Sequence, residues 1–234
     1  MRRLFTSLAV AGAFVGFFAA APVGADQPVV VELYTSQGCS SCPPADELLG
    51  KLAKRNDVIA LALHVDYWDY IGWKDKFASP AFTKRQKSYA VSGGRRMVYT
   101  PQMIIDGQDH VVGNHPMDVS DLIRKHAAEG ADVTVDMKRN GNTLQLTVSA
   151  PRNVGRALVQ IVRYDPASKV AIKRGENAGR TLTYHNIVTE WRVVETWNGR
   201  GTKTLSLPIT GKQPIVAIVQ SDKHGPILGA ARLR

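Results

Sequence analysis

The distribution of apolar residues divides the chain into two regions with different periods. In the first region, residues 29–33 and 58–65 are continuous β-branched and aliphatic runs, which is typical of buried parallel strands. Between them, from residue 43, apolar side chains recur at helical spacing. Acidic residues lie near the start of this segment and basic residues near its end, as the helix dipole favours. The pattern therefore predicts a strand, a helix and a second strand.

The following segment continues this mixed architecture. Residues 67–98 combine aromatic residues with helical patches, and we expect an inserted helical segment there. Residues 100–113 predict a hairpin that turns at Asp106-Gly107. A helix should then run up to Gly130, because glycine commonly ends helices.

After residue 130 the apolar residues alternate with polar ones, which is the period of a strand with one buried face. A hairpin is expected over residues 133–150, with its turn at Asn140-Gly141. Further strands are expected at residues 157–164, 190–197, 202–209, 214–221 and 227–233. The polar stretch at residues 173–186 is expected to be a connecting loop. Short strands at this spacing favour an antiparallel sandwich.

The predicted fold class is therefore an α/β unit with a helical insertion, residues 26–130, followed by an all-β antiparallel sandwich, residues 131–234. Residues 1–25 read as a secretory signal peptide, with Arg2 and Arg3 before an apolar run and a small-residue cleavage site. The run is shorter than the roughly 20 residues that span a bilayer. We expect cleavage, no stable membrane anchor, and a periplasmic or secreted protein.

The formal net charge of +10 is scattered along the chain rather than gathered in a basic tract. This distribution is typical of a solvated surface, and we expect no nucleic-acid partner. Export would place the protein where disulfides persist. The chain has only two cysteines, too few for a disulfide framework, so the two need another explanation.

Cys39 and Cys42 lie in the stretch "YTSQGCSSCPPADELL", directly before the predicted helix. As a structural staple, a four-residue loop would constrain the unfolded chain by only about 2 kcal/mol. A zinc site would need four ligands, which His64, His110 and His115 could help to complete. Two thiolates could also bind monovalent copper. These alternatives remain open at the level of the residues.

Thiol–disulfide exchange is the interpretation that the context favours. Cys39 is expected at the start of the helix, where free amides and the positive end of the dipole stabilise a thiolate. Cys42, one turn further along, should be more buried and able to attack a mixed disulfide within the same molecule. Asp46 and Glu47 oppose thiolate formation at Cys39 through their charge.

The order strand, C-x-x-C, helix, strand, helical segment, Thr-Pro strand, hairpin, helix resembles the thioredoxin fold over residues 29–130. The resemblance implies a cis bond at Thr100-Pro101, facing the cysteines and pairing with the backbone of a substrate. It also implies that Glu32 takes the place of the buried acid that helps to move the proton of the resolving cysteine. Glu32 lies one residue further from Cys39 than is usual in that family.

Residues 29–49, 64–73 and 100–107 are similar to a secreted bacterial thioredoxin-like family of unknown function. The resulting hypothesis is an extracytoplasmic thiol–disulfide oxidoreductase that acts on protein or peptide thiols and on a redox partner protein, without a cofactor or a bound metal. The expected catalytic residues are Cys39, Cys42 and Glu32, and the expected substrate-binding residues are Thr100 and Pro101.

Two other functional classes remain open. One is a copper or zinc carrier that uses both thiolates, and the other is a partner-binding module with an inert disulfide. His64 and Asp66, followed by Trp68 and Trp73, either belong to a substrate groove or metal site or form a packed aromatic cluster.

Overall fold

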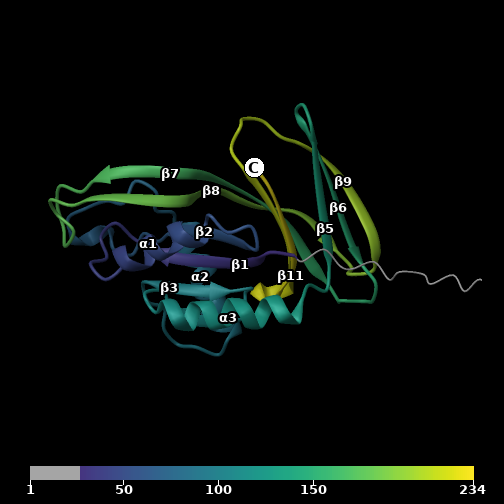
Figure 1. Cartoon of the computed structure of the whole chain (residues 1–234), viewed down its shortest axis with the longest axis horizontal. Coiled ribbons are helices and arrows are strands. Elements are labelled where there is room, and N and C mark those ends of the chain that lie inside the picture. The colour runs from purple at the N-terminus through teal and green to yellow at the C-terminus, as the bar shows by residue number, and fades with distance from the viewer. Residues whose placement is uncertain (1–26) are drawn as a thin grey trace, which may run out of the picture.

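The computed structural model of the chain describes residues 27–234, so the expected signal peptide lies outside the described residues. Figure 1 shows a long mixed sheet flanked by helices at one end, with a second, smaller sheet at the other end. Within residues 27–234, the helices are all too short or too polar to cross a membrane.

The first half of the chain forms the predicted elements. They are β1 (Val29–Thr35), α1 (Pro43–Leu52), β2 (Val58–His64), the short 3-10 helix η1 (Asp69–Ile71), α2 (Pro80–Ser92), β3 (Gln102–Ile105), β4 (Asp109–Val112) and α3 (Pro116–Glu129). β1 lies between β2, which is parallel to it, and β3, which is antiparallel. All seven residues of β1 and of β2 are buried, which explains their largely apolar sequences.

The side chains of β1 alternate between two cores, one on each face of the sheet. Val31 and Leu33 pack with Ala45 and Leu49 of α1. Residues 30 and 34 of the same strand point to the opposite face, where α2 packs. This alternation decides which polar side chains of β1 can reach the cysteine pair.

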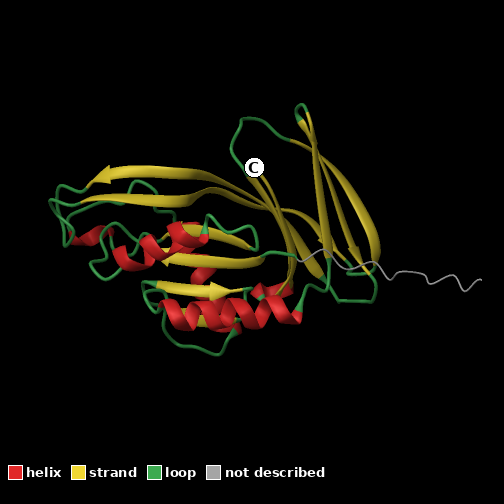
Figure 2. Ribbon diagram, viewed as in Figure 1, coloured by secondary structure: helices red, strands yellow, loops and turns green. Residues whose placement is uncertain are grey.

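The second half of the chain is built from strands. They are β5 (Thr134–Asn140), β6 (Thr143–Ala150), β7 (Ala157–Ala171), β8 (Thr181–Trp197), β9 (Gly201–Pro208), β10 (Ile215–Ser221) and β11 (Ile227–Leu233), with the 3-10 turn η2 (Asp222–His224) before the last. A three-stranded sheet, β5-β6-β9, packs on β7, β10 and β11 around an apolar core. Figure 2 shows the three α-helices gathered at one end and strands alone at the other. The expected fold class, an α/β sheet with helices followed by an antiparallel β region, is confirmed.

The two halves share one sheet, in the order β11-β10-β7-β8-β2-β1-β3-β4. Within this sheet the two halves meet where β8 lies beside β2, with Ala62 opposite Ile187 in a parallel arrangement. A division into domains near Gly130 therefore stays a prediction, and the strands on either side of it form a continuous layer.

Two local expectations need correction. The β5–β6 turn is made by Gly141 and Asn142, since Asn140 already pairs with Thr143. Gly141 has a φ of +58°, so the turn needs its glycine at the first position. The polar stretch at residues 173–186 is also not wholly a loop, because residues 181–186 belong to β8. The connection shrinks to residues 172–180, here called the β7–β8 tip.

Candidate redox site

Cys39 and Cys42 form a disulfide at the end of the loop that connects β1 to α1. The amide of Cys42 donates to the carbonyl of Cys39 at 3.3 Å, so the pair closes a tight turn. The helix begins at Pro43, and Cys42 is its capping residue. The expectation that Cys39 itself starts the helix is therefore wrong by about one turn.

This shift changes the electrostatics expected for Cys39. Pro43 and Pro44 have no amide hydrogens, and the next two amides, of Ala45 and Asp46, both donate to the carbonyl of Cys42. Free amides of the first helical turn are thus not available to a Cys39 thiolate in the way the sequence suggested. The Ser41 hydroxyl lies 3.4 Å from Cys39 Sγ and is the polar side chain in contact with it.

Both cysteines are buried in this disulfide form. Cys39 is 1 % exposed and Cys42 is 0 % exposed, whereas Ser40 and Ser41 between them are exposed. The expected difference in burial between the two cysteines is therefore absent here. Reaction at Cys39 requires some of the covering residues to move.

The β7–β8 tip provides part of this cover. Asn177, which is buried, donates from Nδ2 to the carbonyl of Gln37 at 3.0 Å and to that of Cys39 at 2.9 Å. The Glu176 carboxylate accepts from the amide of Ser40 at 3.3 Å. The sequence predicts only a connecting loop at these residues. No local pattern could have placed them beside cysteines that lie 138 residues away.

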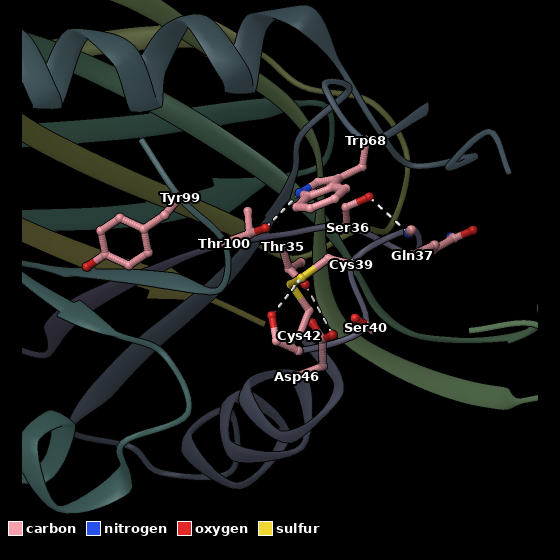
Figure 3. The surroundings of a disulfide bond; sticks show 12 residues. Thr35, Ser36, Gln37, Cys39, Ser40, Cys42, Asp46, Trp68, Tyr99 and Thr100 are labelled. Atoms are coloured by element: carbon pink, nitrogen blue, oxygen red, sulfur yellow. Dashed lines mark hydrogen bonds between the residues drawn. A yellow bond between two sulfur atoms is a disulfide. The ribbon is translucent and has the colours of Figure 1, made fainter. Parts of the chain in front are cut away.

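The Thr100–Pro101 bond is cis, as the resemblance implied. Trp68 donates from its indole nitrogen to the Thr100 hydroxyl at 2.8 Å, and Figure 3 shows both side chains next to the disulfide. Gly113 lies between Pro101 and Ala45 of α1, because a Cβ there would approach the Cβ atoms of both residues to 3.3 and 3.2 Å. The proline thus faces the first turn of α1, and its contact with a substrate stays a prediction.

Asp46 lies one helical turn after Cys42, on the same face of α1. Its carboxylate accepts from the Thr35 hydroxyl at 3.1 Å, and Figure 3 shows it directly beneath the disulfide. The side chain is 5 % exposed, and burial raises the pKa of Asp46 from 3.8 to about 7. In the sequence prediction, Asp46 enters only through the effect of its charge on the Cys39 thiolate. Its spacing of four residues from Cys42, which is visible in the sequence, already places it one helical turn from that cysteine.

Glu32 does not face Cys42. It points to the opposite side of β1, where its carboxylate accepts two hydrogen bonds from Arg85, both at 2.7 Å. The hydroxyls of Tyr89 and Tyr34 also donate to it, at 2.6 and 2.9 Å. The expected catalytic role of Glu32 is corrected accordingly, because the alternation of β1 places α1 and Glu32 on different faces of the sheet.

A second buried polar group lies behind the cysteine loop. His64 Nδ1 is 2.7 Å from Asp75 Oδ2, and both side chains are 0 % exposed. The imidazole packs edge-on against Phe77 and Tyr184. Of the two readings of His64, the packed aromatic cluster matches this environment. Asp66 lies apart from it and accepts from Thr83.

Within the described residues, histidine, cysteine, aspartate and glutamate form no group of three or more that could hold a metal ion. The histidines considered as zinc ligands are dispersed. His110 contacts Gln102, and His115 contacts Asp118 on the exposed start of α3. The two sulfur atoms are bonded to each other.

Known proteins are similar to this chain in sequence and in fold. A family model described as "Protein of unknown function (DUF1223)" matches residues 30–220. The crystal structure of a structural-genomics target from Agrobacterium tumefaciens, AtR35, is 35% identical, with a TM-score of 0.77 over 88% of this chain and 93% of that one. HBP35 of Porphyromonas gingivalis is 16% identical, with a TM-score of 0.66 over 89% of this chain and 75% of that one, and so shares the fold. No curated protein matches the chain significantly.

Proposed function

The chain belongs to the DUF1223 family, whose function is unknown, and from this starting point we propose that it is an extracytoplasmic thiol–disulfide oxidoreductase of thioredoxin-like design. Its substrates would be protein or peptide thiols, and a redox partner protein would regenerate it. The observation that carries the proposal is the C-x-x-C disulfide before α1, with a buried acid of near-neutral pKa one turn behind Cys42. Such an acid can give and accept a proton at neutral pH.

In the oxidising direction, a substrate thiolate attacks Cys39 Sγ. The Cys39–Cys42 bond breaks, its electron pair moves to the Cys42 sulfur, and protonated Asp46 supplies the proton that converts this sulfur to a thiol. A second substrate thiolate then attacks the substrate sulfur of the mixed disulfide and releases Cys39. The substrate becomes a disulfide and the protein a dithiol, so electrons balance.

The reducing direction uses the same atoms. The Cys39 thiolate attacks a substrate disulfide and releases the first substrate sulfur as a thiolate. Ionised Asp46 then takes the proton of Cys42, and the Cys42 thiolate attacks Cys39 Sγ and releases the second substrate sulfur. The role of Thr100-Pro101 is to bring the substrate backbone alongside the cysteines. The closeness of Pro101 to the first turn of α1 supports that role.

The test uses the protein without residues 1–25 and follows the oxidation and reduction of a model dithiol peptide. We expect Cys39→Ser to lose turnover completely, because no Cys39–Cys42 disulfide remains to accept the attack and no Cys39 thiolate remains to attack a substrate disulfide. Cys42→Ser should retain the first step of the reducing direction, in which Cys39 attacks a substrate disulfide, and accumulate a mixed disulfide that mass spectrometry detects. Ser40→Ala, which changes an exposed neighbour, is the matched control and should retain turnover. Equal turnover in wild type and Cys39→Ser would contradict the proposal.

One observation favours a second candidate, a partner-binding module with an inert disulfide: the near-complete burial of Cys39 under the β7–β8 tip. The two candidates differ in how the folded protein responds to a mild reductant. An inert bond should resist reduction until the protein unfolds. A redox-active bond should open in the native state.

A further inference from the structure

Four titratable side chains from four elements converge behind the cysteine loop. They are Asp46 of α1, His64 at the end of β2, Asp75 of the segment before α2, and Tyr184 of β8. Thr35 and His64 are paired neighbours on β1 and β2, so both project toward α1. The Thr35 hydroxyl donates a hydrogen bond to the Asp46 carboxylate. His64 therefore lies on the strand next to the residue that fixes the position of Asp46.

Asp75 fixes the imidazole of His64. Its Oδ2 faces His64 Nδ1 at 2.7 Å and accepts from the amide of Gln37 at 2.8 Å, while Oδ1 accepts from the amide of Phe77 at 2.8 Å. A carboxylate with these donors accepts a hydrogen bond from the Nδ1–H group, which leaves Nε2 as the second nitrogen of the ring. Asp75 also connects this pair to the loop that carries Cys39, through Gln37.

Two atoms of this group lack hydrogen-bond partners among the described residues, namely His64 Nε2 and the hydroxyl of Tyr184. Their rings are 5.0 Å apart, edge to face. A buried polar atom without a partner is destabilising, so native structures contain few of them. Two such atoms on rings that pack together behind the cysteine loop point to a group suited to proton exchange rather than to stability alone.

We propose that the His64–Asp75 pair tunes the proton exchange of the redox site, by setting the protonation of Asp46 and through it the pH at which Cys42 gains or loses its proton. The inference rests on the proposed function for its consequence in catalysis. His64 and Asp75 act through Asp46, so they are positioning residues and not catalytic ones.

The two members of the pair act on Asp46 with opposite signs. Burial has the largest effect and raises the pKa of Asp46. The charge of a protonated His64 opposes burial and lowers this pKa, whereas the negative charge of Asp75 adds to burial and raises it. Removing His64 should therefore raise the pKa of Asp46, and removing Asp75 should lower it. A role limited to packing would produce no such opposition.

Asp46 also has a route to solvent. It lines a pocket of about 390 Å³ between α1 and β8. The His185 ring lies over Gly50 at this pocket, where a Cβ would come within 2.5 Å of the imidazole. Other charged or titratable groups near Asp46 are Glu47 and Lys51 on α1, Lys54 just after α1, and Tyr184 and His185 on β8.

The experiment measures the pH dependence of the Cys42 step, followed as release of a reporter thiol from a mixed disulfide on Cys39. Compared with wild type, His64→Gln should move the midpoint upward and Asp75→Asn should move it downward, each on the order of one pH unit. Tyr184→Phe is the packing control and should move it least. Shifts of the same sign in His64→Gln and Asp75→Asn, or unchanged midpoints in both, would overturn the inference.

A second measurement needs neither turnover nor a variant that folds. NMR of wild-type protein, observing the Asp46 carboxyl carbon and the His64 ring as the pH is changed, should show the ring signals of His64 following the ionisation of Asp46. His64 ring signals that do not change as Asp46 ionises would overturn the inference even if exchange activity is present. Loss of the proposed function is recognised separately, by equal turnover of wild type and Cys39→Ser.

Discussion

β1 carries buried polar side chains on both faces, and the two clusters around them differ in how completely their atoms are partnered. On the α2 face, Glu32 accepts from Arg85, Tyr89 and Tyr34, and Gln220 of β10 bonds to Arg85 and Tyr89. The guanidinium also lies 3.7 Å from the centre of the Trp191 ring.

The cluster on the α1 face has the same kinds of residue but lacks this saturation. Within residues 27–234, four buried side-chain polar atoms lack a hydrogen-bond partner. Three of them belong to residues of the cysteine loop and the group behind it: Gln37, His64 and Tyr184. Asp46, in the same group, has a pKa near neutrality.

The two faces show how a structural polar cluster differs from a candidate functional one when both are buried. The ion pair on the α2 face holds elements together. On the α1 face, burial brings the pKa of Asp46 near neutrality, so this carboxyl can exchange a proton at neutral pH. Burial and charge alone would have selected Glu32, whereas the near-neutral pKa selects Asp46.

We expect the largest effect from Glu32→Gln, on the α2 face of β1. The change preserves shape but leaves the buried Arg85 charge without its carboxylate, which costs about 3–5 kcal/mol. We expect urea unfolding at pH 7 to show this loss, with the exchange rate per folded molecule unchanged. The double variant Glu32→Gln with Arg85→Met should recover part of the stability. Lost exchange with unchanged stability would reverse the roles assigned to the two faces.

Asp46→Asn is the corresponding change on the other face. Exchange should slow by about 10²-fold, the contribution of a positioned acid–base group. Glu47→Gln, at an exposed neighbouring position, is the matched control and should retain the rate. An unchanged rate in Asp46→Asn would remove Asp46 from the mechanism.

Stability should respond to the same substitution in a pH-dependent way. The pKa of Asp46 is raised in the folded protein from 3.8 to about 7, so the folded state binds the proton more tightly than the unfolded state. Its contribution to stability is complete below pH 3.8 and is lost as the pH rises through 7. Asparagine does not ionise. The free energy of unfolding of Asp46→Asn should therefore increase relative to that of wild type as the pH rises from about 4 to about 8.

The smallest expected effect concerns the β7–β8 tip. Asn177→Ala removes two hydrogen bonds to the cysteine loop, and we expect a loss of about 1–2 kcal/mol in stability. Reduction of the native disulfide by a small thiol should become a few-fold faster, since Cys39 is less firmly covered. Arg174→Ala, at an exposed position of the same tip, should leave both quantities unchanged. Slower reduction in Asn177→Ala would mean that the tip activates the bond.

Local patterns in the sequence predicted much of the α/β half. The apolar runs, the proline-led helix and the turn at Asp106-Gly107 depend on neighbours within a few residues, and each is present. The cysteine pair and the cis bond before Pro101 were likewise found from short motifs. The orientation of Glu32 was predicted wrongly. The extra residue between Glu32 and Cys39 does not by itself show which face of β1 packs against α1.

The missing parts of the site are those that depend on contacts far apart in the chain. Asn177 reaches Cys39 across 138 positions, and Tyr184 reaches His64 from another strand of the shared sheet. The second half of β7 is exposed and polar over much of its length, so its sequence gave no strong strand signal. The pairing of β8 with β2 depends on the fold of the whole chain, so no local pattern in the sequence predicts it.

The shared sheet has a consequence for inheritance. β8 covers the edge of β2, and its hairpin supplies Asn177 to the cysteine loop. A recombination event at residue 130 would therefore replace the cover of a fully buried strand together with a residue that contacts the cysteine loop. Hybrids between distant relatives joined there should tend to aggregate rather than merely lose activity. The two halves are therefore expected to evolve as one unit.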